Sequence, residues 1–249
     1  MSGRTRSPPL VVVGGWGVRA SMLGRLVSGW SGSVDFVSLN DGLMAANASV
    51  ASLAQNLMQH FPDPAVWLGW SQGAQVVMAA ATCPGTPVVK AVTLAGFPRF
   101  VAGSDWSPGM APDTFKAFHD ALITDSERTW RRFQQLLVYG SSGPESAAVR
   151  RELKPWLAAG PVANAENLRK GLDWLAWEDQ RQAWQQADLP ALHLLAGADA
   201  LVRPWATDLS MSGAASVKTL PGMTHWPTGL HLAICRQALA EFALAEEMV

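Results

Sequence analysis

A serine between glycines is the residue of this chain best suited to act as a nucleophile. It stands at the centre of Gly69-Trp70-Ser71-Gln72-Gly73. A serine hydroxyl attacks a carbonyl carbon when its backbone geometry exposes it and a neighbouring base takes its proton. A G-x-S-x-G turn between a strand and a helix supplies that exposure, because glycines tolerate the tight backbone. The pattern predicts acyl transfer, provided that a base and an acid follow in the chain.

His225 is the base that we expect to serve this serine. It lies in a loop, residues 221–227, between a predicted strand and the last predicted helix. A loop at the carboxyl end of a strand is where a parallel sheet displays its ligand-facing groups. His231, inside that helix, is the alternative base. His225 is preferred because loops on a rigid scaffold carry most catalytic groups.

Asp199 is the carboxylate that we expect to orient the histidine and stabilise its imidazolium form. It follows the apolar run 191–197 and so belongs to the carboxyl edge of the predicted sheet. Asp188 precedes the same run and would lie at the opposite edge. The order Ser71, Asp199, His225 along the chain is the order found in α/β-hydrolases. The sequence therefore predicts a catalytic triad.

Acyl transfer also needs donors for the oxyanion that develops on the attacked carbonyl. The backbone N–H of Gln72, directly after the nucleophile, is one candidate. The other is the backbone N–H of Trp16, in the glycine-rich loop 14–17 after the first predicted strand. That loop lacks the G-x-G-x-x-G spacing of a dinucleotide site. No metal-ligand spacing or phosphate loop is evident, so we expect neither a metal nor a cofactor.

Alternating strands and helices would position these residues. Apolar strand-like runs occupy residues 10–13, 34–39, 65–68, 88–96, 191–197 and 216–220. Helix-like segments occupy residues 21–28, 49–61, 74–81 and 230–246. Near-continuous Val, Leu and Ala strands that alternate with helices predict a mostly parallel sheet with helices on both faces, the α/β class.

Residues 103–186 interrupt this alternation, because no convincing strand occurs among them. Helical stretches are predicted at residues 113–122, 126–138, 145–158, 163–175 and 180–185. Strands on both sides of the interruption belong to one sheet in the simplest topology. We therefore expect an α/β-hydrolase core formed by residues 1–102 and 187–249, and an inserted helical lid formed by residues 103–186.

The composition limits the partners and the location. Hydrophobic residues make up 49% and charged residues 16% of the chain, as in a globular protein with a large core. The net charge of -1 gives no bulk attraction to nucleic acid or anionic membranes. The first apolar run, residues 10–13, is too short for a signal peptide or a membrane span. We expect a cytoplasmic monomer.

Four segments resemble motifs of the pimeloyl-ACP methyl ester esterases, the α/β-hydrolase carboxylesterases of biotin synthesis. They are residues 15–17, 67–73, 128–133 and 222–227. The resemblance covers essentially the whole chain. It implies hydrolysis of the methyl ester of pimeloyl-ACP to pimeloyl-ACP and methanol by a Ser-His-Asp acyl-enzyme mechanism, without a cofactor.

The resemblance also implies an acyl carrier protein as partner, bound by arginines of the insertion. Arg128 and Arg132 are four residues apart and share one face of a helix. Guanidinium groups suit carboxylates and phosphates. The expected carrier-protein surface consists of Arg128, Arg132, Arg150, Arg151 and Lys154. The expected substrate site consists of Trp16, Ser71, Gln72, His225 and one run of the insertion: Phe133, Gln134, Gln135, Leu136 and Leu137.

Three positions depart from that family, which usually has histidine at Gly14 and leucine at Gln72. A short loop at residues 40–44 stands where the family has a glycine-rich stretch. These departures affect substrate range more than reaction type, because no triad member is lost. A general short-chain carboxylesterase, or a hydrolase of another small ester or lactone, is the alternative. A non-catalytic binding module is disfavoured, since it leaves the Ser, His and Asp constellation unexplained.

Overall fold

A six-stranded sheet lies at the centre of the computed structural model, which describes residues 7–139, 151–156, 158–211 and 215–245. All neighbouring strands are parallel, in the order β2-β1-β3-β4-β5-β6. The strands are β1 (Leu10–Val13), β2 (Val34–Val37), β3 (Ala65–Trp70), β4 (Val88–Leu94), β5 (Ala191–Ala196) and β6 (Ala215–Leu220). Every residue of β1, β3 and β5 is buried, and all of them except His193 are apolar.

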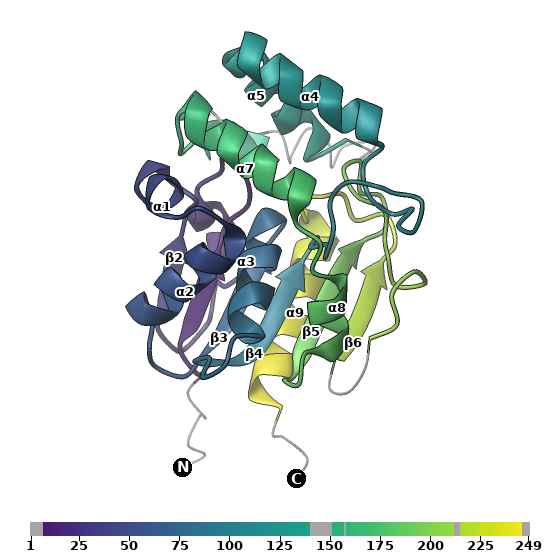
Figure 1. Cartoon of the computed structure of the whole chain (residues 1–249). Coiled ribbons are helices and arrows are strands. Elements are labelled where there is room, and N and C mark those ends of the chain that lie inside the picture. Colours follow the sequence, from purple (N-terminus) through teal and green to yellow (C-terminus); the bar gives the residue numbers. More distant parts are fainter. Residues whose placement is uncertain (1–6, 140–150, 157, 212–214, 246–249) are drawn as a thin grey trace, which may run out of the picture.

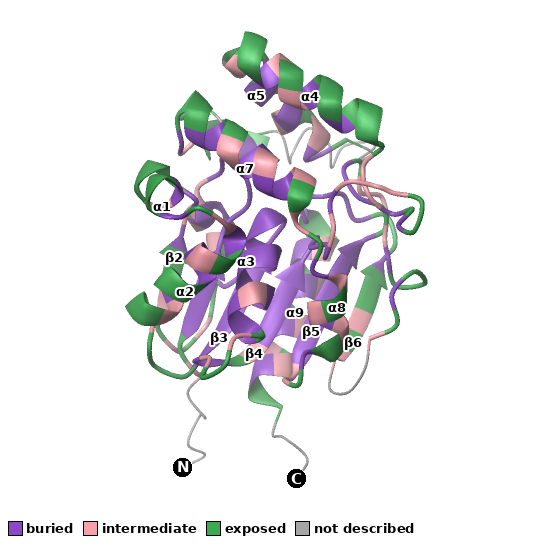
Figure 2. Cartoon of the chain, viewed as in Figure 1, coloured by how far each residue is buried: buried purple, intermediate pink, exposed green. Residues whose placement is uncertain are grey.

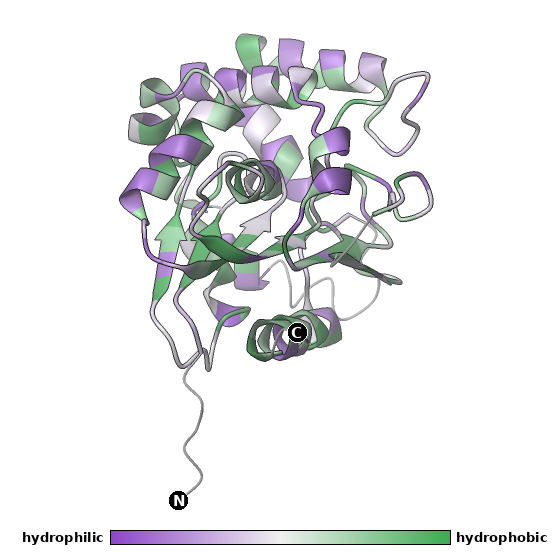
Figure 3. Cartoon of the chain, turned by 60° about the horizontal axis from the view of Figure 1, so that its bottom comes forward, coloured by the Kyte–Doolittle hydropathy of each residue, from purple (hydrophilic) through white to green (hydrophobic). Residues whose placement is uncertain are grey.

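Helices cover both faces of the sheet, as the sequence predicted. On one face, α3 (Gln72–Ala81) packs on β3 and β4, with α2 (Val50–His60) and α8 (Arg181–Gln186) beside it. The other face carries α9 (Gly229–Leu244), against β5, and the short 3₁₀ helix η1 (Ala20–Arg25). Figure 3 shows α9, which leads to the carboxyl terminus, on the side of the sheet opposite most of the other helices. The predicted α/β fold is confirmed.

Three helices lie above the carboxyl ends of the strands (Figure 1). They are α4 (Pro112–Thr124), α5 (Ser126–Leu136) and α7 (Ala165–Trp177). The chain enters them from β4 and returns to β5, which pairs directly with β4. The predicted helix 145–158 lies partly outside the described residues. The predicted helix 180–185 corresponds to α8, but it packs on α3 beside the sheet and not above the strand ends. Figure 2 shows exposed outer faces on α4 and α5 and buried strands beneath.

Residues 40–44 form the start of a helix, α1 (Asp41–Ala46), where the sequence predicted a loop. The Asn40 side chain caps this helix by accepting a hydrogen bond of 3.1 Å from the Leu43 N–H. The Asp41 carboxylate accepts hydrogen bonds from the Asn164 backbone N–H and the Asn167 amide of α7. These two bonds, the backbone one first, lower the pKa of Asp41. The helix thus fastens α7 to the edge of the sheet.

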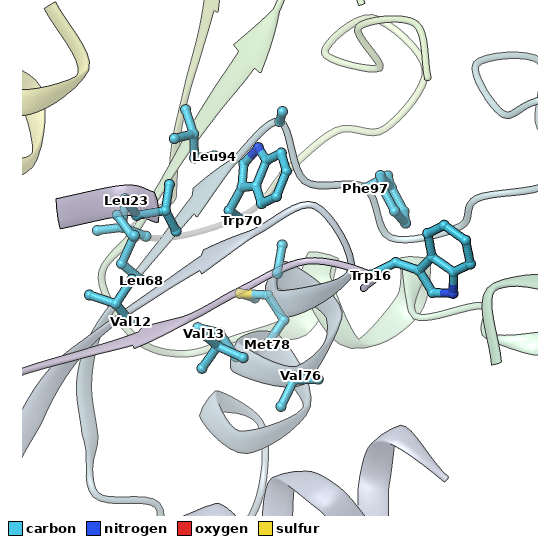
Figure 4. Packing of buried hydrophobic residues seen from close by; sticks show 14 of the residues in the cluster. Val12, Val13, Trp16, Leu23, Leu68, Trp70, Val76, Met78, Leu94 and Phe97 are labelled. Carbon is cyan, nitrogen blue, oxygen red and sulfur yellow. The ribbon is translucent and has the colours of Figure 1, made fainter. Parts of the chain in front are cut away.

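Large apolar side chains fill the interior (Figure 4). Trp70, at the end of β3, is fully buried, and Trp16, beyond the end of β1, is 3% exposed. Several buried indole N–H groups have backbone acceptors, as in the 2.9 Å hydrogen bond from Trp205 to the Gly96 carbonyl. Those of Trp67 and Trp130 have no partner within the described residues. Many of the tryptophans therefore belong to the hydrophobic core, although Trp177, at the end of α7, is 85% exposed.

His193 is a buried histidine of the core, on β5. Its Nδ1 lies 2.8 Å from the Thr93 hydroxyl, and its ring stacks on Trp184 at a centroid distance of 4.9 Å. Burial lowers the pKa of His193 to about 4 from its ordinary value of 6.5. The side chain is therefore neutral in the folded protein at neutral pH.

This burial predicts a loss of stability in mild acid. The unfolded chain takes up the proton near pH 6.5 and the folded protein near pH 4, so the free energy of unfolding falls between these values as the pH falls. From pH 7 to pH 5 the His193 contribution falls by about 2 kcal/mol. Urea unfolding of wild type and His193→Phe at pH 7 and pH 5 measures this change in the free energy of unfolding. An equal pH dependence in the two proteins would contradict the assignment.

Candidate active site

Ser71 lies at the apex of a sharp turn between β3 and α3. Its φ of 56° and ψ of -124° belong to a region that L-residues rarely occupy. Such a conformation costs on the order of 1–3 kcal/mol and persists where the surroundings enforce it. The flanking glycines are required sterically: a Cβ on Gly69 would lie 2.4 Å from the Gly73 carbonyl oxygen, and one on Gly73 would lie 2.3 Å from that of Val13. The turn lifts the serine away from strand and helix.

A continuous chain of hydrogen bonds joins Ser71, His225 and Asp199. The Ser71 Oγ lies 2.9 Å from His225 Nε2, and His225 Nδ1 lies 2.7 Å from Asp199 Oδ2. The side chains of His225 and Asp199 are 0% and 3% exposed. The other carboxylate oxygen of Asp199 accepts the backbone N–H groups of Leu201 and Val202, at 2.8 and 3.2 Å. The aspartate is therefore held as an acceptor facing the imidazole, the geometry that lets a histidine accept a serine proton.

The loop that carries His225 is held from two sides. The Trp70 indole N–H donates a 2.9 Å hydrogen bond to the His225 carbonyl, and the Trp226 N–H donates one of 3.0 Å to the Leu137 carbonyl. The rings of Trp70 and Trp226 meet edge to face at 5.1 Å. Trp70 directly precedes the serine, so the same short segment positions both Ser71 and His225. This positioning role of Trp70 is not evident from the sequence, because the G-x-S-x-G pattern does not specify the residue before the serine.

The glycine-rich loop 14–17 and the start of α3 border Ser71. A Cβ on Gly15 would lie 2.9 Å from the Ser71 Cβ, so the loop backbone approaches the serine closely. Gln72 is the first residue of α3. The first N–H groups of a helix have no carbonyl partner within it, which leaves them free to bind an anion. The structure thus brings Trp16, Gln72 and Ser71 to one end of the sheet.

An apolar pocket opens at Ser71 beneath the helices above the sheet. Its volume is about 30 Å³, close to that of one water molecule. The pocket is lined by Trp16, Ser71, Phe100, Met110, Phe118, Phe133, Leu136, Leu172, Leu175 and Leu201. Apolar side chains thus surround the serine, and a bound alkyl chain would require some of them to move apart.

Only part of the predicted run 133–137 reaches this pocket. Phe133 and Leu136 line it, as expected for residues three apart on α5. Gln134 lines a different groove, Gln135 is exposed, and Leu137 is buried. Consecutive residues of a helix point in different directions, so the five predicted positions could not all face one pocket.

The match to the model of the "Alpha/beta hydrolase family" spans residues 10–235. The chain belongs to the alpha/beta hydrolase family. Two proteins named "Pimeloyl-[acyl-carrier protein] methyl ester esterase" are similar to it. That of Vibrio cholerae is 33% identical over 78% of this chain and 76% of its own length. That of Vibrio vulnificus is 31% identical over 79% and 78%. The resemblance seen in the motifs is confirmed.

Solved structures share the fold of this alpha/beta hydrolase at low sequence identity. An esterase from Exiguobacterium antarcticum superposes with a TM-score of 0.75, at 13% identity, over 97% of this chain and 94% of its own. A bromoperoxidase from Bacillus anthracis gives a TM-score of 0.75 at 16% identity, over 96% and 92%. At sequence identities this low, a structural match shows the fold but not the substrate.

The hydrolase has a second, larger hollow on the outer side of α5. This groove of about 710 Å³ is lined by residues of α5 and of the segment 154–168, among them Arg131, Gln134 and Lys154. Trp130 and Leu168 line it too. A Cβ on Gly17 would lie 2.7 Å from Trp130 and 3.0 Å from Leu168. These two side chains therefore stand between the groove and the loop beside Ser71.

The described cations predicted for a partner surface are all exposed, and Lys154 lines this groove. Arg128 and Arg132 are exposed on α5, and Arg151 and Lys154 are exposed further along the chain. Arg150 lies outside the residues that the structure describes. Arg131, which the sequence analysis did not select, forms a 3.0 Å ion pair with Glu127.

The described residues offer neither a cluster of metal-binding side chains nor a membrane-spanning helix. No group of three or more His, Cys, Asp or Glu side chains within them is arranged to hold a metal ion. None of their helices is both long and apolar enough to cross a membrane.

Proposed function

We propose that this alpha/beta hydrolase is a serine carboxylesterase that hydrolyses the methyl ester of pimeloyl-ACP to pimeloyl-ACP and methanol. The observation that carries the proposal is the hydrogen-bonded chain in which His225 lies 2.9 Å from the Ser71 hydroxyl and 2.7 Å from Asp199. The name printed for the two Vibrio relatives supports the substrate. A cytoplasmic reaction is part of this proposal.

In the first half of the reaction, Ser71 Oγ attacks the ester carbonyl while its proton passes to His225 Nε2. The negative charge that develops on the carbonyl oxygen is stabilised by the N–H groups of Trp16 and Gln72. Asp199 accepts the Nδ1–H and stabilises the imidazolium. The intermediate then collapses: the bond from the carbonyl carbon to the methoxy oxygen breaks, the imidazolium proton goes to that oxygen, and methanol leaves.

In the second half, water hydrolyses the acyl-enzyme. His225 takes a proton from the water, whose oxygen attacks the acyl carbon, and the same two N–H groups stabilise the second oxyanion. The bond to Ser71 Oγ breaks and the serine regains a proton from His225. The product is a carboxylate, which an apolar pocket holds poorly, since an unpaired charge is costly to bury.

The apolar pocket suits the methylene chain of a pimeloyl group. Because the pocket holds only about 30 Å³, the chain requires Phe133, Leu136 or the helices that carry them to move outward. We propose that residues 103–186 act as a lid on a core formed by residues 1–102 and 187–249. The part of this lid above the strand ends comprises α4, α5 and α7, whereas α8 stays against the sheet.

We propose that an acyl carrier protein docks on the exposed cations of α5 and the groove beside it. Carrier proteins of this kind are acidic, and this chain has a net charge of only -1, so the attraction must be local. Arg128 and Arg132 point to solvent on α5, and Lys154 lines the adjoining groove. Two further residues complete the proposed surface: Arg151, which is exposed, and Arg150, which lies outside the described residues.

Reversing two of these charges is expected to weaken turnover of the carrier-linked ester. Arg128→Glu with Arg132→Glu should raise KM for pimeloyl-ACP methyl ester by about 10-fold at low salt, since rim charges mainly steer association. Turnover of p-nitrophenyl butyrate should stay at the wild-type rate. Lys218→Glu, an exposed cation on β6, is the matched control and should change neither activity. Equal losses on both substrates would contradict a docking role.

Genetic rescue tests the proposed substrate. A biotin-requiring strain that lacks its own esterase should grow without biotin when it expresses this protein, and should not grow with the Ser71→Ala variant. The alternative function, hydrolysis of another small ester or lactone, rests on the departures at Gly14 and Gln72. It is favoured if the protein hydrolyses p-nitrophenyl esters well but does not restore growth.

A further inference from the structure

The side chains of Trp16 and Gln72 both bind one helix of the lid. The Trp16 indole N–H donates a 2.8 Å hydrogen bond to the carbonyl of Leu168, and the Gln72 amide donates one of 2.8 Å to the carbonyl of Gly171. Both acceptors belong to α7 and lie three residues apart, so they face the same side of the helix. One turn of α7 thus receives a hydrogen bond from each residue proposed to stabilise the oxyanion.

The three groups meet at Gly171. A Cβ on this glycine would lie 2.8 Å from the Trp16 ring and 3.4 Å from the Gln72 amide oxygen. A larger residue at this position would separate α7 from both. Trp16 is 3% exposed and Gln72 is 0% exposed, so water does not compete for these hydrogen bonds.

The Gln72 amide is poorly explained by stability alone. Its Oε1 is buried and has no hydrogen-bond partner within the described part of the chain. A buried polar atom without a partner costs about 1–3 kcal/mol. Gly171 lies inside α7, so its carbonyl also accepts the helical hydrogen bond from residue 175 and does not depend on Gln72. A methionine of similar length would remove the unpaired oxygen and leave no acceptor unsatisfied.

We propose that one turn of α7 is a template that sets the spacing of the oxyanion hole, with the side chains of Gln72 and Trp16 as its positioning groups. The backbone N–H groups of these same residues are the donors in the proposed esterase mechanism, on which this inference rests. A shift of either donor strains the hydrogen bond that its own side chain makes to α7. A separation held in advance is what makes such donors effective, because they need not reorganise during the reaction.

The helix itself is fixed to the core away from the active site. The Trp174 indole N–H donates to the Ala48 carbonyl at 3.1 Å, and the Lys170 ammonium donates to the Met44 carbonyl at 2.6 Å. Asp41 adds the hydrogen bonds from Asn164 and Asn167. A helix anchored at several points along its length can act as a rigid reference for two short loops.

The test is a set of variants assayed with p-nitrophenyl butyrate, which needs no carrier protein. Gln72→Met should lower kcat by about 10-fold with KM unchanged, less than the 10²–10³-fold cost of removing a donor outright. Its affinity for a trifluoromethyl ketone, which forms an oxyanion with the serine, should fall by the same factor. Its melting temperature should equal or exceed that of wild type. Trp16→Phe, the second variant, should lower the affinity for the same inhibitor.

The double variant and a matched control complete the test. Gln72→Met with Trp16→Phe should be no slower than the slower single variant, because the two side chains act as one unit. Trp30→Phe removes an indole hydrogen bond to the Pro8 carbonyl that plays no part in the template, and it should lower the melting temperature but not kcat. An unchanged kcat in Gln72→Met, an unchanged inhibitor affinity, or losses that multiply in the double variant would overturn the proposal. Wild type without esterase activity would instead refute the proposed function.

Discussion

Replacing Ser71 with alanine is expected to lower kcat for p-nitrophenyl butyrate by about 10⁶-fold, the cost of losing the nucleophile in a serine hydrolase. The substitution removes the attacking atom, the Oγ that lies 2.9 Å from His225. Steady-state hydrolysis measures the loss. A fluorophosphonate probe should label wild type and fail to label the variant, because an unactivated serine does not react.

The fold should survive this substitution, so lost activity can be assigned to chemistry. Serine and alanine both carry a Cβ, so alanine meets the same backbone strain at position 71. The substitution removes the hydrogen bond between the hydroxyl and His225. The melting temperature is therefore expected to stay near that of wild type. Ser210→Ala, at an exposed serine, is the control and should keep full activity and labelling. Turnover by Ser71→Ala at the wild-type rate would contradict the assignment of the nucleophile.

Replacing Asp199 with asparagine is expected to lower kcat by about 10⁴-fold. The asparagine oxygen can still accept the N–H groups of Leu201 and Val202. Its NH₂ group would then face His225 Nδ1, which must become an acceptor. The ring proton would move to Nε2, where it blocks transfer of the Ser71 proton. Hydrolysis of p-nitrophenyl butyrate near neutral pH measures the effect.

Asp188→Asn is the matched control for this variant. Asp188 lies before β5, at the opposite end of the strand from Asp199, and is exposed. It should therefore tolerate asparagine with unchanged kcat. A large loss in Asp188→Asn together with a small loss in Asp199→Asn would show that the wrong carboxylate has been assigned.

The sheet and the ends of its strands could be predicted from the sequence because their physical causes are local. Strands buried on both faces need continuous apolar residues, and those runs are evident in β1, β3 and β5. The carboxyl ends of parallel strands share one edge, so residues placed just after different strands must lie near one another. That rule is enough to expect Ser71, Asp199 and His225 at one edge, where the structure has them.

Details that depend on tertiary contacts could not be predicted in this way. Which side chains of residues 133–137 face the pocket depends on how α5 is rotated over Trp16, and only packing sets that rotation. The helix at Asp41 needs the cap from Asn40 and contacts with α7, which is distant in sequence. The hydrogen bond from Gln72 to Gly171 likewise joins residues 99 positions apart.

The proposed substrate can be tested by turnover of pimeloyl-ACP methyl ester by the purified protein, followed by mass spectrometry of the carrier-linked acyl chain. We expect loss of the methyl group with release of one methanol per acyl chain, and no change with the Ser71→Ala variant. A methyl ester that stays intact under conditions in which p-nitrophenyl butyrate is hydrolysed would contradict the proposed substrate.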